Sequence, residues 1–129
     1  MRLRMTIISA VTLLVILCAS GGTPARAAEH TATIQGYVID SACTFVKNLK
    51  KPASPECAVT CAKAGSPLVI LADNGAIYWP ISDATPATSQ NERLMEFAGK
   101  KVSVTGRVFS RSGSRAIVMG KIEAAPAGK

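Results

Sequence analysis

Residues 91–109 read NERLMEFAGKKVSVTGRVF, and this stretch decides the fold. Its first half, Asn91 to Ala98, has the apolar spacing of a two-turn helix, with Asn91 in the N-cap position and Gly99 directly after the last residue. From Lys101 to Phe109 apolar and polar residues alternate, which is the period of a half-buried strand. The stretch therefore predicts a short helix followed at once by a strand.

Four more strand-like runs flank this passage. The run at 115–123 follows it after a Ser/Gly-rich turn. Upstream, LVILA at 68–72 and AIYWPI at 76–81 are separated by Asp-Asn-Gly, and Asn-Gly between two such runs is the strongest short hairpin signal. ATIQGYVID at 32–40 completes the set. The chain is therefore expected to contain five strands.

A second helix is predicted in the connection between the first two strands. Ser54 is a good N-cap, Pro55 suits the first helical position, and Gly65 suits a left-handed cap at the end. Five strands with a helix between the third and fourth is the element order of an OB-fold. We therefore predict a mainly β chain that forms a five-stranded OB-fold-like Greek-key barrel, with an extra cysteine-bearing helix between strands 1 and 2.

Two segments carry a resemblance to known proteins. LMEFAGKKVSVTG at 94–106 resembles the helix-to-strand passage of small bacterial periplasmic OB-fold proteins. GYVIDSAC at 36–43 and CAVTCAKAGSPL at 57–68 resemble an uncharacterised family of small exported bacterial OB-fold-like domains, which share a G-x-V-x-D-x-x-C … C-x-x-x-C pattern. The resemblance covers nearly all of the chain after residue 27 and implies export and a barrel fold, but little about activity.

The first 27 residues have the features of a secretory signal peptide. Two arginines precede an apolar run at 7–18 that is too short to span a bilayer, and Ala-Arg-Ala at 25–27 fits a cleavage site. Lipidation at Cys18 is the alternative. We therefore expect a signal peptide over 1–27, a single domain over 28–124, a flexible tail over 125–129, and a periplasmic or secreted location.

The charge of the chain argues against nucleic acid as a partner. The 129 residues carry 15 basic and 8 acidic side chains, a net charge of +7. Residues 1–27 hold three of the basic ones and no acid, so the remainder has 12 − 8 = +4. That is too mild for nucleic-acid binding. No membrane association is expected after signal removal, and a small ligand, a metal ion or a periplasmic protein is the expected partner.

Three cysteines, Cys43, Cys57 and Cys61, are expected to meet beside the barrel. Cys57 and Cys61 share one helix face, but their Cβ atoms should lie about 5–6 Å apart, whereas a disulfide needs about 3.8 Å. A bridge from Cys43 to a helix cysteine closes a loop of 15 or 19 residues, worth about 3 kcal/mol. We predict a Cys43–Cys61 disulfide that leaves Cys57 as a spare thiol.

The same three sulfurs could instead hold a metal ion. Ligands at i and i+4 on a helix suit one ion, and thiolates favour a soft ion such as Cu(I) or Zn(II). Asp40, three residues before Cys43, and His30, the only histidine, are the candidates for a fourth ligand. The structural disulfide and the metal site are both kept as interpretations.

Catalysis is the less favoured hypothesis. A thiol-dependent redox carrier or enzyme is the alternative function, because Cys57 lies near a helix N-terminus, where thiol pKa values fall. C-x-x-x-C is one residue longer than the redox motif, however, and no histidine is placed beside a cysteine. No catalytic residue is assigned. Tyr37, Tyr78 and Trp79 are assigned to packing rather than to a stacking platform. The main interpretation is a non-enzymatic binding or structural module.

Overall fold

The computed structural model describes residues 28–126. The predicted signal peptide over 1–27 and the lipidation considered at Cys18 lie outside these residues, as do the last three residues of the chain. No helix within residues 28–126 is long and apolar enough to cross a membrane.

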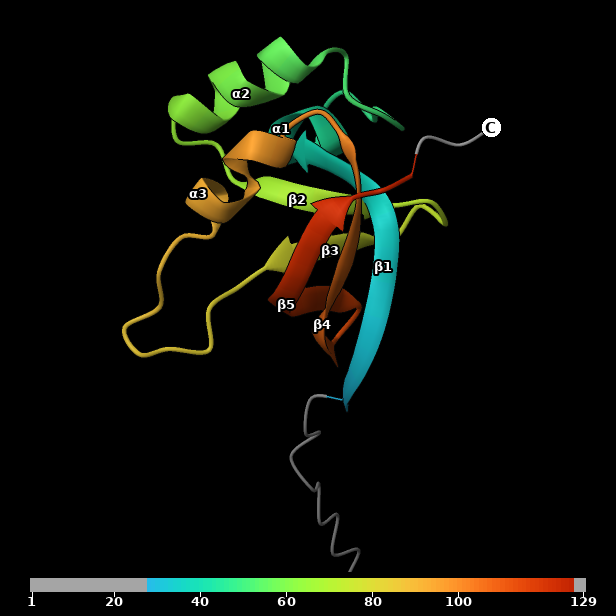
Figure 1. Cartoon of the computed structure of the whole chain (residues 1–129), viewed down its shortest axis with the longest axis vertical. Coiled ribbons are helices and arrows are strands. Elements are labelled where there is room, and N and C mark those ends of the chain that lie inside the picture. Colours follow the sequence, from blue (N-terminus) through green and yellow to red (C-terminus); the bar gives the residue numbers. More distant parts are fainter. Residues whose placement is uncertain (1–27, 127–129) are drawn as a thin grey trace, which may run out of the picture.

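Five strands form a closed barrel, as the sequence predicts (Figure 1). Around the barrel the strand order is β1-β2-β3-β5-β4, and β3 runs parallel to β5 while every other neighbouring pair is antiparallel. The strands are β1 Ala28–Asp40, β2 Leu68–Ala72, β3 Ile77–Pro80, β4 Lys101–Arg111 and β5 Ser114–Ala124. The OB-fold-like architecture is therefore confirmed.

The long strand β1 is shared between two neighbours. It pairs with β4 over 28–37 and with β2 over 36–40, so Gly36 faces both partners. A Cβ atom on Gly36 would collide with the carbonyl group of Leu71, which explains why glycine occupies the point where the pairing passes from one neighbour to the other. β1 begins four residues earlier than the alternating pattern indicates.

Between residues 28 and 126, four short helical segments accompany the strands: α1 Ser41–Phe45, α2 Pro55–Lys63, α3 Asn91–Leu94 and the 3₁₀ turn η1 Met95–Phe97. α2 begins as the sequence predicts, because the Ser54 side chain accepts a hydrogen bond of 3.1 Å from the Cys57 amide. It is followed by Gly65 at φ +97°, the left-handed conformation expected there. α1 and α2 lie together at the end of the barrel where β1 ends (Figure 1).

The prediction that Asn91 caps the helix expected over residues 91–98 is wrong. Gln90 occupies the N-cap position and Asn91 is the first helical residue. The Asn91 amide is used elsewhere: its oxygen accepts from the Leu68 amide at 3.0 Å, and its nitrogen donates to the Ser66 carbonyl at 2.8 Å. Asn91 therefore fastens α3 to the start of β2.

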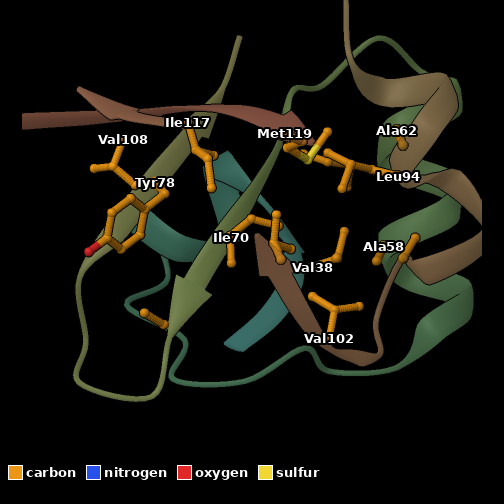
Figure 2. Close-up of a cluster of buried hydrophobic side chains, with 14 residues drawn as sticks. Val38, Ala58, Ala62, Ile70, Tyr78, Leu94, Val102, Val108, Ile117 and Met119 are labelled. Atoms are coloured by element: carbon orange, nitrogen blue, oxygen red, sulfur yellow. The ribbon is translucent and has the colours of Figure 1, made fainter. Parts of the chain in front are cut away.

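The barrel interior and one face of α2 share a single hydrophobic core. Ala58 and Ala62 are almost fully buried, and Figure 2 shows them pointing from α2 towards the side chains of Val38, Leu94 and Val102. Small residues at i and i+4 let the helix lie close to the open end of the barrel. α2 therefore closes that end of the barrel.

Gly99 sets how closely α2 approaches the barrel. It has φ +78°, its amide donates to the Val38 carbonyl at 2.8 Å, and a Cβ atom there would collide with the backbone of Pro55. The first residue of α2 thus rests directly on the glycine that precedes β4. No side chain fits between them.

A second, smaller core lies on the outer face of β1 and β2. It consists of Ile39, Cys43, Val69 and Leu71, with Leu49, Ile77 and Trp79 packed around it. Because β2 contributes to both cores, all five of its residues are buried, and its sequence LVILA is apolar throughout. The outer core holds Cys43, the first of the three cysteines.

Candidate metal centre

Three cysteines converge at the end of the barrel covered by α1 and α2. The Sγ atoms of Cys43, Cys57 and Cys61 all lie within 4.8 Å of one another. Cys43 is buried, Cys61 is half-buried and Cys57 is exposed. The cluster predicted from the sequence is therefore present, and it reaches from the outer core to the solvent.

α2 supplies two of the three sulfurs. Cys57 and Cys61 are separated by one helical turn, and each directly precedes one of the alanines that face the barrel, Ala58 and Ala62. Adjacent residues on a helix point about 100° apart. The face that carries the sulfurs is therefore next to the face that packs on the barrel, and docking of the helix fixes both.

α1 supplies the third sulfur, and Asp40 places it. Asp40 is the N-cap residue of α1. Its carboxylate oxygen Oδ1 accepts a hydrogen bond from the Cys43 amide at 2.8 Å, and its backbone carbonyl accepts one from the Thr44 hydroxyl at 2.9 Å. The second carboxylate oxygen, Oδ2, accepts from the hydroxyl group of Ser66. Asp40 is only 2% exposed, so these bonds hold a buried carboxylate between the end of β1 and the segment that follows α2.

Neither candidate for a fourth ligand belongs to the cluster. Both oxygens of Asp40 already accept hydrogen bonds, and, among the residues that the structure describes, the group of donor atoms around the sulfurs contains only the three cysteines. His30 pairs with Val108 near the start of β1. Ten residues separate it from the Asp40 end, which corresponds to on the order of 30 Å of strand. Pairing with β4 makes the segment around His30 part of the barrel.

The surroundings of Cys43 and Cys61 favour the protonated form of both thiols when no ion is bound. Burial, the hydrogen bond to Asp40 and the negative charge of that carboxylate raise the pKa of Cys43 to about 11. Burial and the same charge also raise the pKa of Cys61. For Asp40 itself burial acts to raise the pKa, but the hydrogen bonds from Ser66 and Cys43 more than offset it, so its pKa lies below the usual value.

The space beside the sulfurs is very small. A cavity of about 10 Å³ lies between Cys43, Cys57 and the Pro52–Ser54 segment. That volume holds about one water molecule, and so also an ion, but no organic substrate. Together with the raised pKa of Cys43, this argues against a thiolate nucleophile acting on a substrate at the buried end of the cluster.

All three cysteines are free thiols in this structure. The Cys43–Cys61 disulfide predicted from the sequence is not formed, and a bond between any two of the sulfurs needs an approach to about 2.05 Å. The pairing stays a prediction.

Tyr78 and Trp79, two of the three aromatic residues assigned to packing, both pack against other side chains. Tyr78 is buried in the barrel core. Trp79 packs against Phe45 of α1, with ring centroids 6.0 Å apart and planes 17° from parallel. Trp79 therefore contributes to the packing of the helix that carries Cys43.

Sequence reasoning missed the residues that support the cluster. Ser66 and Asn91 connect Asp40 to α3 through side-chain hydrogen bonds. The signal for Asp40 was present, since aspartate directly before a Ser-Ala-Cys run is a good N-cap. Nothing local indicates that Ser66 and Asn91 meet.

Comparisons of the chain with protein-family models, curated proteins and solved structures found no significant match. The arguments on function therefore rest on the site.

Proposed function

We propose that this chain is an exported binding module that holds one soft metal ion, Cu(I) or Zn(II), through Cys43, Cys57 and Cys61. The observation that carries the proposal is the convergence of three free thiols, from two separate helices, within 4.8 Å. Thiolates are the preferred ligands of such ions. Export is part of the proposal and is supported by the signal-peptide features of residues 1–27.

The geometry is close to that of a bound site. With metal–sulfur bonds of about 2.3 Å, the sulfurs of a tetrahedral site lie about 3.8 Å apart. No two of the sulfurs are more than 4.8 Å apart, so no pair needs to approach by more than about 1 Å to reach that separation. Cys43 needs no movement, because Asp40 and the outer core already hold it.

Loading exchanges protons for the ion. Each thiol must lose its proton to become a ligand, and the positive ion replaces protons that burial and Asp40 hold tightly on Cys43 and Cys61. Affinity is therefore expected to rise with pH across the neutral range. Release at lower pH follows from the same exchange.

Metal binding is tested on the reduced chain, from residue 28 onwards, under anaerobic conditions. Titration with Cu(I) or Zn(II) in competition with a chromophoric chelator should give one ion per chain, and thiol-to-metal charge-transfer absorption should reach its plateau at the same ratio. Alanine at any one of the three cysteines should weaken binding at least about tenfold. A matched control is Thr60→Ala, an exposed substitution on α2 that leaves the cluster intact.

Equal affinity in the wild type and in all three cysteine variants would contradict the proposal. So would a chain that competes with the chelator no better than free thiol at the same concentration. Asp40→Asn should keep the stoichiometry of one ion, because the carboxylate positions Cys43 rather than binding the ion.

A disulfide staple is the second candidate function, and the closeness of the sulfurs favours it as well. If the chain is exported it reaches a compartment where disulfides persist, and a Cys43–Cys61 bond would join α1 to α2 and leave Cys57 free. Alkylation of the protein as isolated, read by mass spectrometry with and without reductant, separates the two. One free thiol plus one bridge supports the staple, and three thiols that react only after a chelator is added support metal.

A further inference from the structure

Residues 28–126 supply three ligands and no fourth. In the part of the chain that the structure describes, the donor atoms that meet at the cluster are the sulfurs of Cys43, Cys57 and Cys61 alone. Asp40 has both carboxylate oxygens engaged, by the Cys43 amide and the Ser66 hydroxyl. His30 lies at the other end of β1. A divalent ion that prefers four ligands is thus left with one position for a ligand from outside residues 28–126.

The direction of that position follows from burial. Cys43 is buried, and Ile39 and Asp40 beside it are 1% and 2% exposed, so the inner side of the cluster is closed. The cavity between Cys43 and Cys57, beside Ser54, has only about 10 Å³, so a larger ligand cannot enter between these two residues. Cys57, in the first turn of α2, is exposed. An ion held by the three sulfurs therefore faces solvent on the side of Cys57.

Charge selects the kind of ligand that can fill the position. Three thiolates around a divalent ion leave one net negative charge, and the buried Asp40 carboxylate next to Cys43 adds another. A fourth anion would meet repulsion from two charges at short range. A neutral donor such as water or an imidazole ring adds no charge, and imidazole suits Zn(II) well.

From these three observations, and building on the proposed metal site, we infer that the bound divalent ion keeps one solvent-facing coordination position beside Cys57, which takes a neutral monodentate ligand of the imidazole type. Water fills the position when no such ligand is present. A site of this kind differs from a closed structural site, because a ligand can be exchanged without unfolding the protein. The ligand can come from a free small molecule or from a histidine of another protein.

The test uses Co(II) as a spectroscopic substitute for Zn(II) in the reduced chain. Co(II) loading is followed by thiolate charge-transfer absorption in the near ultraviolet and by d–d absorption in the visible. Imidazole is then added to the loaded protein. The expected result is a saturable shift of the d–d bands with one imidazole per chain, while the charge-transfer intensity, which reports the three thiolates, stays constant. Acetate should bind at least about tenfold more weakly than imidazole.

Each other outcome overturns one specific statement. Failure of Co(II) to load through the cysteines contradicts a divalent ion at the proposed site, whereas failure of both the Cu(I) and the Zn(II) titration described above contradicts the proposed metal site itself. Normal loading with d–d bands that do not respond to imidazole contradicts the open position alone. Acetate binding as tightly as imidazole contradicts the preference for a neutral ligand.

The His30→Ala variant shows whether another copy of the chain already provides the imidazole. His30 lies at the opposite end of β1, so the variant should give the same spectrum and the same imidazole titration as the wild type. A changed spectrum before imidazole is added would mean that a histidine from a second molecule fills the position, and the statement that water fills it in the protein alone would be wrong.

Discussion

Replacing Asp40 by alanine should destabilise the metal-free protein by about 3 kcal/mol. The substitution removes the N-cap of α1, worth about 1 kcal/mol. It also removes the charged acceptor of the Ser66 hydroxyl, a hydrogen bond worth about 2 kcal/mol. Because a domain of this size has roughly 5–15 kcal/mol of stability, the loss is large but should leave a folded protein to measure.

Urea unfolding of the reduced protein, followed by circular dichroism, measures this loss. Asp40→Asn should cost only about 1 kcal/mol, since the amide oxygen can still accept from the Cys43 amide and the Ser66 hydroxyl can turn to accept from the amide nitrogen. Asp83→Ala is the matched control. Asp83 is also a hydrogen-bonded carboxylate, but its side chain is 60% exposed and pairs with Arg107 on the surface, so its loss should cost less than about 1 kcal/mol. An Asp40→Ala variant as stable as Asp83→Ala would refute the role given to Asp40.

Three further outcomes are expected. Gly99→Ala should lower the free energy of unfolding by at least about 2 kcal/mol and weaken metal binding, because it combines a positive φ with a collision at Pro55. Urea unfolding measures the first effect and chelator competition the second. A variant with native stability would contradict the docking described for α2. The raised pKa of Cys43 stabilises the folded state fully below the unfolded pKa of about 9, and this stabilisation is lost as the pH rises through the folded pKa of about 11. The free energy of unfolding of the metal-free protein should therefore fall by about 2 kcal/mol over this pH range. The Cys43→Ala variant should not show this fall. In metal-free protein iodoacetamide should label the exposed Cys57 well before the buried Cys43, and the reverse order by mass spectrometry would show that α1 opens more readily than the packing implies.

The sequence predicts the barrel well because its signals are local. Alternation at 101–109 and Asn-Gly at 74–75 each specify an element within a few residues, and β4 and the β2–β3 hairpin are found there. α2 is found where Ser54 and Gly65 place it, because caps are also local signals.

The parts that were missed depend on contacts between distant segments. The first residues of β1, Ala28 to Thr31, are exposed and lack an apolar pattern, and they form a strand because β4 provides a partner at 107–110. α1 has only five residues, too few for a helical period to be visible in the sequence. Asn91 reads as a cap locally, but its amide bonds to the start of β2.

The sequence predicts which residues form the candidate site, but it does not predict whether they bind a metal ion or form a disulfide. The convergence of Cys43, Cys57 and Cys61 follows from the end of one strand and the face of one helix, and it is confirmed. Whether the sulfurs bind an ion or form a bridge depends on distances of about an ångström, on bound ions and on redox conditions. The sequence does not specify these.

One face of α2 completes the barrel core through Ala58 and Ala62, while the neighbouring face presents Cys57 and Cys61 to the third sulfur. An ion bound by the sulfurs is therefore bound to α2, the same helix that keeps water out of the barrel. Binding at a thousand times the dissociation constant would add about 4 kcal/mol to the free energy of unfolding. Loss of the ion would then make undocking of α2 easier and expose the apolar end of the barrel. The supply of the metal would in this way set the rate at which proteases degrade the protein.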